Sequence, residues 1–120
     1  MANSNPPPHD ATTTLADVKA VMETFVAERN WEKFHLPKNL AISIAIEAAE
    51  LMELFQWDGV RTSEAVQQNP EQMQRIREEL SDVFAYTLAM ANRLNIDLAL
   101  AFAAKMEMNR EKYPAGEEQF

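Results

Sequence analysis

The sequence has 120 residues, of which 47% are hydrophobic, so it provides one domain with one modest core. Its 2 glycines argue against the tight hairpins of an all-β fold, and the absence of cysteine excludes disulfides, thiolate metal sites and cysteine nucleophiles. The formal net charge of -8 argues against a sequence-independent grip on DNA or RNA, but it is compatible with a small phosphate ligand that binds through a cation.

The first residues, MANSNPPPHDATTT, have neither the basic end nor the apolar run of a secretion signal. No apolar run approaches the ~18 residues of a membrane span. Together with the lack of cysteine, these features favour a cytoplasmic protein without a membrane partner.

The chain reads as helices joined by short connections. Residues 1–13 are polar and proline-rich and are predicted to be a disordered tail, whereas Thr14 can cap a helix. Pro37 and Pro70 mark starts of later helices, and Asn95 interrupts the pattern. Long helices are expected over about residues 14–30, 38–57, 70–94 and 97–112, with a short helix near 63–68 and a frayed end at 115–120. The prediction is an all-α fold, a four-helix bundle formed by a single domain over residues 14–114.

Two acid pairs lie on the predicted core-facing edges of the long helices. On a wheel of roughly 100° per residue, Glu47 falls inside the apolar stripe of the second long helix, and Glu50 lies one turn further on the same side. Glu79 and Asp82 repeat this arrangement in the third long helix, whereas Glu78 points well away. Each helix therefore brings one pair of carboxylates toward the core.

Four carboxylates converging in a helical core resist ionisation unless positive charge neutralises them, and neither pattern contains a lysine or an arginine. A divalent metal is the economical partner, and the all-oxygen donor set favours Mg²⁺, with Mn²⁺ as the alternative, over zinc or copper. The two histidines, His9 and His35, lie outside both patterns, so the Glu-x-x-His pairs of di-iron bundles are missing.

Several segments carry a family resemblance. EAAELMELFQW, EELSDVFAYTLAM and KMEMNREKYP, with ERNWEKFHLPKNL upstream, resemble the MazG-like all-α nucleoside triphosphate pyrophosphohydrolases. The likeness is strongest to the dCTP pyrophosphatase branch and covers about residues 15–114. It implies Mg²⁺-dependent hydrolysis of dCTP or related dNTPs between the α and β phosphates, which releases a nucleoside monophosphate and pyrophosphate and cleans the nucleotide pool.

The resemblance also implies roles for individual residues. The positions that match the Mg²⁺ ligands and catalytic acids are Glu47, Glu50, Glu79 and Asp82. Glu50 is our choice among them for the acid that takes a proton. The positions that match the base and sugar pocket are Trp31, His35, Trp57 and Tyr86. The positions on the phosphate side are Lys105, Asn109, Lys112 and Tyr113.

Helical spacing supports the last group, because Lys105 and Asn109 share one face of the last helix with Lys112. Lys112 equally fits a role beside the helix dipole, and tryptophans at helix ends equally fit packing roles. The chain departs from the family at Ala48 and Ala49, where a glycine is common. It also has methionine at position 22, near the place where some relatives have a pocket histidine.

Two other functions stay open at this point. One is a non-catalytic helical interaction module, in which the acids only form interhelical ion pairs. The other is a related pyrophosphohydrolase with the same metal site and a different substrate, such as phosphoribosyl-ATP.

Apolar residues also lie on further sides of the two acid-bearing helices. Ile42 and Ile46 fall roughly opposite the stripe of the second long helix, and Phe84 and Leu88 point away from the Glu79 side of the third. A helix that is apolar all round is normally buried all round, and one chain of this length cannot easily cover two such helices. We therefore expect a homo-oligomer. The resemblance favours a tetramer over a dimer, with active sites near subunit interfaces.

Overall fold

The computed structural model describes residues 7–59 and 61–116, and every regular element within these ranges is helical. The elements are α1 (Leu15–Glu28), the short 3-10 helix η1 (Glu32–Phe34), α2 (Pro37–Glu53), α3 (Ser63–Gln67), α4 (Pro70–Leu94) and α5 (Leu98–Lys112). The all-α class and the four long helices are thus confirmed. In the described part of the chain, no helix is long and apolar enough to cross a membrane.

Local side-chain caps explain where most of these helices begin and end. Thr14 and Asp17 form a capping box at the start of α1, since each side chain accepts a hydrogen bond from the backbone N–H of the other residue. The side chains of Asn69 and Asp97 cap α4 and α5 in the same position. Asn95 ends α4 in the left-handed conformation, with φ of 55°, which asparagine tolerates better than most residues.

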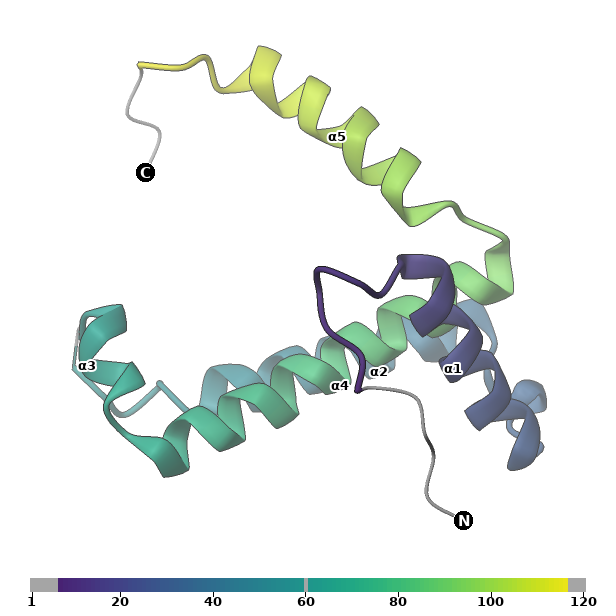
Figure 1. The fold of residues 1–120 in the computed structure, drawn as a ribbon, viewed down its shortest axis with the longest axis horizontal. Coiled ribbons are helices and arrows are strands. Elements are labelled where there is room, and N and C mark those ends of the chain that lie inside the picture. The colour runs from purple at the N-terminus through teal and green to yellow at the C-terminus, as the bar shows by residue number, and fades with distance from the viewer. Residues whose placement is uncertain (1–6, 60, 117–120) are drawn as a thin grey trace.

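The core lies where α1, α2 and α4 meet (Figure 1). α2 and α4 pack side by side, and α1 and α3 each pack on α4. Val26, Leu40, Leu88, Ala89 and Ala91 are buried there, and the two alanines let neighbouring helices approach α4 closely. The prediction that Leu88 needs a second subunit to cover it is therefore wrong, because Leu88 is buried in the core of its own chain.

Hydrogen bonds between distant segments fix the end of α4 against α1 and η1. Asn92 Nδ2 donates to the backbone oxygen of Lys19 at 2.9 Å, and Lys19 Nζ donates to the oxygen of Ile96 at 2.8 Å. The guanidinium of Arg93 donates to the backbone oxygens of His35 and Glu32 at 3.1 and 3.2 Å. The turn between α1 and α2 is thus held to α4 by a single arginine.

α5 runs away from the other helices after the turn at residues 95–97 (Figure 1). It makes no packing comparable to that of α1, α2 and α3 with α4. Its Phe102 side chain is 67% exposed, and Leu100 and Met108 are exposed as well. Within one chain, therefore, three of the four long helices pack together and the fourth presents apolar side chains to solvent.

The two chain ends are described only in part. Residues 1–6 and 117–120 lie outside the described residues, so the disordered tail and the frayed end stay predictions there. Residues 7–13 are described and contain a hydrogen-bonded turn that leads directly into the cap of α1.

Candidate functional site

The predicted acid pairs meet between α2 and α4. One carboxylate oxygen from each of Glu47, Glu50 and Glu79 lies within 4.8 Å of the others. The side-by-side packing of α2 and α4 produces this cluster, because Glu47 and Glu50 project from α2 and Glu79 projects from α4. Asp82 is one turn further along α4, and its charge acts on both Glu47 and Glu79.

Two oxygens in this cluster have no partner within the described part of the chain. Glu47 Oε2 and Glu79 Oε2 are shielded from solvent, and no hydrogen-bond donor reaches either of them. A buried anionic oxygen without a partner is costly, so the arrangement calls for a cation. Carboxylate oxygens from two helices are the donors that Mg²⁺ and Mn²⁺ prefer, and the residues present therefore fit a divalent ion of this kind.

The electrostatics of the cluster support the same conclusion. Burial raises the pKa of Glu47 to about 7, and hydrogen bonding with Glu50 and the negative charges of Glu50, Asp82 and Glu79 act in the same direction. Burial also raises the pKa of Glu79, with smaller contributions from Glu50 and Asp82. Glu47 and Glu79 are thus harder to ionise than ordinary glutamates, and a cation bound among these carboxylates would favour their charged forms.

A cavity of about 1020 Å³ opens beside the acid cluster, between α1 and α4. Its volume is at the upper end of the range for small-molecule sites, so it has room for a nucleoside. Asp82, whose charge acts on Glu47 and Glu79 of the acid cluster, also lines the wall of this cavity. The cavity walls also include Phe25, Trp31, His35 and Tyr86.

These four rings form a continuous aromatic wall. Phe25 and Trp31 meet edge to face with centroids 5.6 Å apart, and the His35 ring lies 6.5 Å from both Trp31 and Tyr86. His35 is only 8% exposed. Burial lowers its pKa, and the nearby Arg93 charge acts in the same direction, so the imidazole is held neutral at physiological pH.

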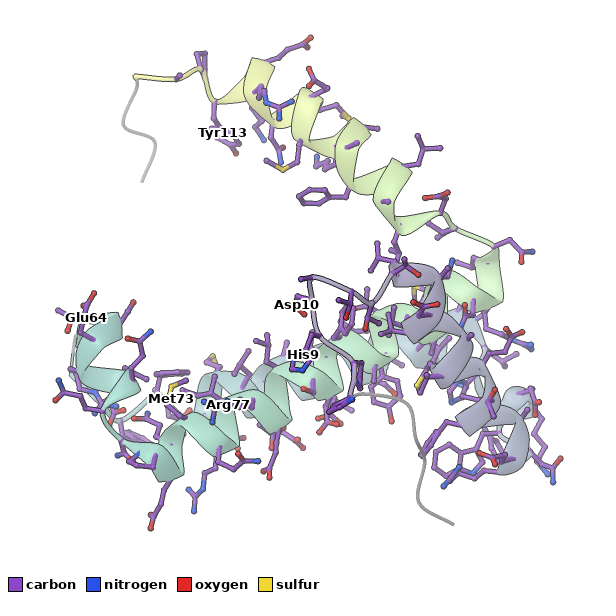
Figure 2. The ribbon with its side chains drawn as sticks, in the orientation of Figure 1. His9, Asp10, Glu64, Met73, Arg77 and Tyr113 are labelled. Carbon is purple, nitrogen blue, oxygen red and sulfur yellow. The ribbon has the colours of Figure 1, made fainter. Side chains whose placement is uncertain are left out.

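The structure does not bring all the predicted substrate residues to this cavity. Trp57 lies in the turn after α2, is 89% exposed and is not part of the cavity wall. The residues of the predicted phosphate side lie on α5 or directly after it, and Figure 2 shows Tyr113 just after the end of α5, away from α4. No observation tests the predicted roles of four residues, which stay predictions: Lys105, Asn109, Lys112 and Tyr113.

Comparison with known proteins places the chain in a family. A model of the MazG-like family matches residues 42–119. The chain belongs to the MazG-like family. The human and rat proteins named dCTP pyrophosphatase 1 are 43% and 42% identical to it over 102 and 101 residues, or 85% and 84% of this chain. The match spans only 60% and 59% of the length of those relatives.

A solved structure agrees as well. A pyrophosphatase from Archaeoglobus fulgidus superposes on this MazG-like chain with a TM-score of 0.73 and 37% identity, and the match covers 90% of this chain and 99% of that one. The predicted family membership is therefore confirmed by sequence and by fold.

Three contributors to the site of this MazG-like chain were not predicted from its sequence. Phe25 is one of the apolar residues of α1, and Arg93, which holds His35, belongs to no motif, so the sequence singles out neither of them. Residues 7–13 were assigned to a tail, although Pro7, Pro8 and Thr12 line the cavity. The run of threonines just before α1 was the available signal, because such residues close local turns with their side chains.

Proposed function

We propose that this chain hydrolyses nucleoside triphosphates, dCTP or related dNTPs, between the α and β phosphates, and releases the nucleoside monophosphate and pyrophosphate. The observation that carries the proposal is the junction of two sites at Asp82, where a carboxylate cluster with orphaned buried oxygens adjoins an aromatic cavity large enough for a nucleoside. The names of the human and archaeal relatives support the same reaction.

In this proposal, Glu47, Glu50, Glu79 and Asp82 hold Mg²⁺, for which Mn²⁺ is the alternative ion. The ion, when bound, supplies positive charge for the triphosphate oxygens and lowers the pKa of water at the site. The four carboxylates fix the place at which the triphosphate must lie. Glu50 projects into the cluster between Glu47 and Glu79, and we assign it the role of accepting a proton during hydrolysis.

The aromatic cavity binds the base and the sugar. Trp31 and Tyr86 offer ring faces on which a base can stack. The neutral imidazole of His35 has one nitrogen that donates and one that accepts, so it can read the edge of a base without contributing charge. The hydrogen bond from Arg93 to the backbone oxygen of His35 holds this residue in place, and with it the edge of the imidazole that meets the base.

The proposed enzyme is a cytoplasmic homo-oligomer, with a tetramer favoured over a dimer. In one chain, α5 lies away from α4, so its basic and amide side chains do not close the acid site. In the assembly, α5 supplies Lys105 and Asn109 to the phosphates of a bound nucleotide, and Lys105 neutralises the departing pyrophosphate.

The proposal is tested by incubating the purified protein with Mg²⁺ and a panel of ribo- and deoxyribonucleoside triphosphates and phosphoribosyl-ATP, and by separating pyrophosphate from phosphate. We expect pyrophosphate and a monophosphate, with dCTP among the preferred substrates. Release of single phosphates, or no turnover of any nucleotide, would refute it. Turnover of phosphoribosyl-ATP alone would still support the proposed metal site, but it would show that the substrate is phosphoribosyl-ATP rather than a dNTP.

Matched variants connect the activity to the acid cluster. Glu47→Gln and Asp82→Asn are each expected to lower turnover by roughly 100-fold or more, because each removes a charge that holds the metal ion. Glu78→Gln removes an equivalent charge from the exposed side of α4 and is expected to have nearly wild-type activity. Circular dichroism of each variant checks that the helices are retained.

A further inference from the structure

The segment of residues 7–13, here called the N-terminal segment, forms one side of the cavity. Pro7, Pro8, Thr12 and Thr13 line the same space as Asp82 and the aromatic rings. Figure 2 labels His9 and Asp10 in the loop that this segment forms before α1. The described residues at the start of the chain therefore form part of the wall of the site.

Hydrogen bonds fix the shape of this segment. The backbone N–H groups of Thr12 and Thr13 both donate to the oxygen of His9, at 3.0 and 2.8 Å. The next residue, Thr14, is the N-cap of α1 and is locked to Asp17 by the capping box. The segment is thus tied to α1, one of the two helices that enclose the cavity.

The two ends of the cavity differ in chemistry. Asp82 lies at the end next to the acid cluster, whereas the N-terminal segment contributes two prolines and two threonines, and the nearby Asp17 carboxylate of α1 already accepts the backbone N–H of Thr14. A nucleotide with its phosphates at the acid cluster has its nucleoside inside the cavity, so the base and sugar meet the N-terminal segment. This step rests on the function proposed above.

The hydroxyl groups of the two threonines are used differently. Thr12 Oγ1 donates its proton to the backbone oxygen of His9 at 3.4 Å. Thr13 Oγ1 instead accepts from the N–H of His9 at 3.2 Å, and none of the described residues accepts its proton. Thr13 is half-buried in the cavity wall, so its proton is available to a bound ligand.

We propose that the N-terminal segment is a fixed wall of the nucleoside pocket and that the Thr13 hydroxyl donates a hydrogen bond to an acceptor atom of the bound nucleoside. Thr13 is therefore a substrate-binding residue, while the acid cluster does the chemistry. Pro7 and Pro8 add apolar surface on the same side, and their fixed φ angles reduce the conformational freedom lost on binding.

The test compares three full-length variants with the wild type. Thr13→Val removes the hydroxyl at nearly constant volume, Thr13→Ser keeps the hydroxyl, and Thr62→Val is the matched control, because the Thr62 hydroxyl likewise accepts a local backbone N–H, that of Ala65, and lies outside the cavity wall. For Thr13→Val we expect the KM for dCTP to rise roughly twofold to tenfold, the effect of one neutral hydrogen bond, with kcat unchanged. Thr13→Ser is expected to restore the wild-type KM, and Thr62→Val to resemble the wild type.

Binding of dCMP in the absence of metal, measured by calorimetry on the same proteins, separates this inference from the proposed function. A wild type without hydrolytic activity would refute the proposed function, and the weaker dCMP binding of Thr13→Val would still support the wall. An unchanged KM and dCMP affinity in Thr13→Val, or equal losses in Thr62→Val and Thr13→Val, would overturn the inference.

Discussion

Glu47 illustrates how a single residue links stability to function in this fold. One of its carboxylate oxygens is buried without a partner, and its pKa of about 7 lies well above the 4.5 of an unperturbed glutamate. Between these two values, the folded chain binds a proton that the unfolded chain has already released, so stability falls as pH rises. This contribution is fully present below about pH 4.5 and is lost as pH rises through about 7.

We therefore expect Glu47→Gln to be more stable than the wild type at pH 8 in the absence of metal, and to show a weaker decline in stability between pH 5 and pH 8. The amide cannot ionise, so repulsion from Glu50, Asp82 and Glu79 is relieved. Urea denaturation at both pH values measures the effect.

The difference between the wild type and Glu47→Gln isolates this contribution from other groups. His35, whose pKa is lowered, contributes with the opposite sign, since its protonation below about pH 6.5 favours the unfolded chain. Glu78→Gln, on the exposed side of α4, serves as the charge control. Parallel pH profiles for the wild type and Glu47→Gln would contradict the assignment of Glu47.

The buried carboxylate oxygens of Glu47 and Glu79 that have no partner predict how Mg²⁺ changes the stability of the wild type. Protons and the metal ion compete for the Glu47 and Glu79 carboxylates, so added Mg²⁺ is expected to raise the melting temperature more at pH 8 than at pH 5. Thermal denaturation with and without Mg²⁺ checks this without any measurement of activity. An equal shift in Glu47→Gln would show that the ion binds elsewhere.

At the scale of elements, Arg93 holds η1 and His35 against α4. Its guanidinium donates to two backbone oxygens, one in η1 and one in the residue directly after η1. We expect Arg93→Ala to lower the free energy of unfolding by about 1–3 kcal/mol, the range for a charge-assisted hydrogen bond. Nucleotide binding should weaken as well, because the His35 edge loses its support.

Arg93→Lys is the matched variant for this prediction. Lysine keeps the charge but lacks the planar fork that donates to two oxygens at once, so it should recover only part of the stability and of the nucleotide affinity. Chemical denaturation and calorimetric titration measure the two quantities. Wild-type binding in an Arg93→Ala variant would show that this attachment does not position the pocket.

The helices and the acid cluster were predictable because their signals are local. Thr14 and Asn95 mark a helix start and a helix end through their own side chains and backbone, and the i,i+3 acid pairs follow from helical geometry. The direction of α5 depends on the turn at residues 95–97, which a hydrogen bond from Lys19, a residue far away in the sequence, holds at Ile96, so the sequence alone could not predict it. The position of residues 7–13 depends on the walls that α1 and α4 give to the cavity, and α4 lies far along the chain.

At the scale of the molecule, a single chain exposes more surface than its size explains. Its radius of gyration is 17.4 Å, whereas a compact domain of this length has about 14 Å. Its accessible surface is 9802 Å², compared with roughly 6,600 Å² for a compact monomer of 13.7 kDa. The excess, roughly 3,000 Å², is in the range that obligate subunit interfaces bury.

The apolar residues on this surface indicate what covers it. Ile46 on α2 is 51% exposed and Phe102 on α5 is 67% exposed, and the same is true to a similar degree of Ile42 and Leu100. Within one chain, α5 does not pack on α2 or α4. The apolar side chains of α5 from a second copy can therefore cover these two helices. A second copy of this chain is therefore the expected partner.

We expect light scattering to give a mass of several 13.7 kDa chains at micromolar and lower concentrations, with four chains favoured over two. Phe102→Glu and Ile46→Glu should lower this mass, because each places a charge within an apolar contact. Gln68→Glu adds the same charge at an exposed polar position at the end of α3 and should leave the mass unchanged. A stable, active species at the mass of one chain would contradict the prediction, because α5 would then have to support activity with its apolar face in water.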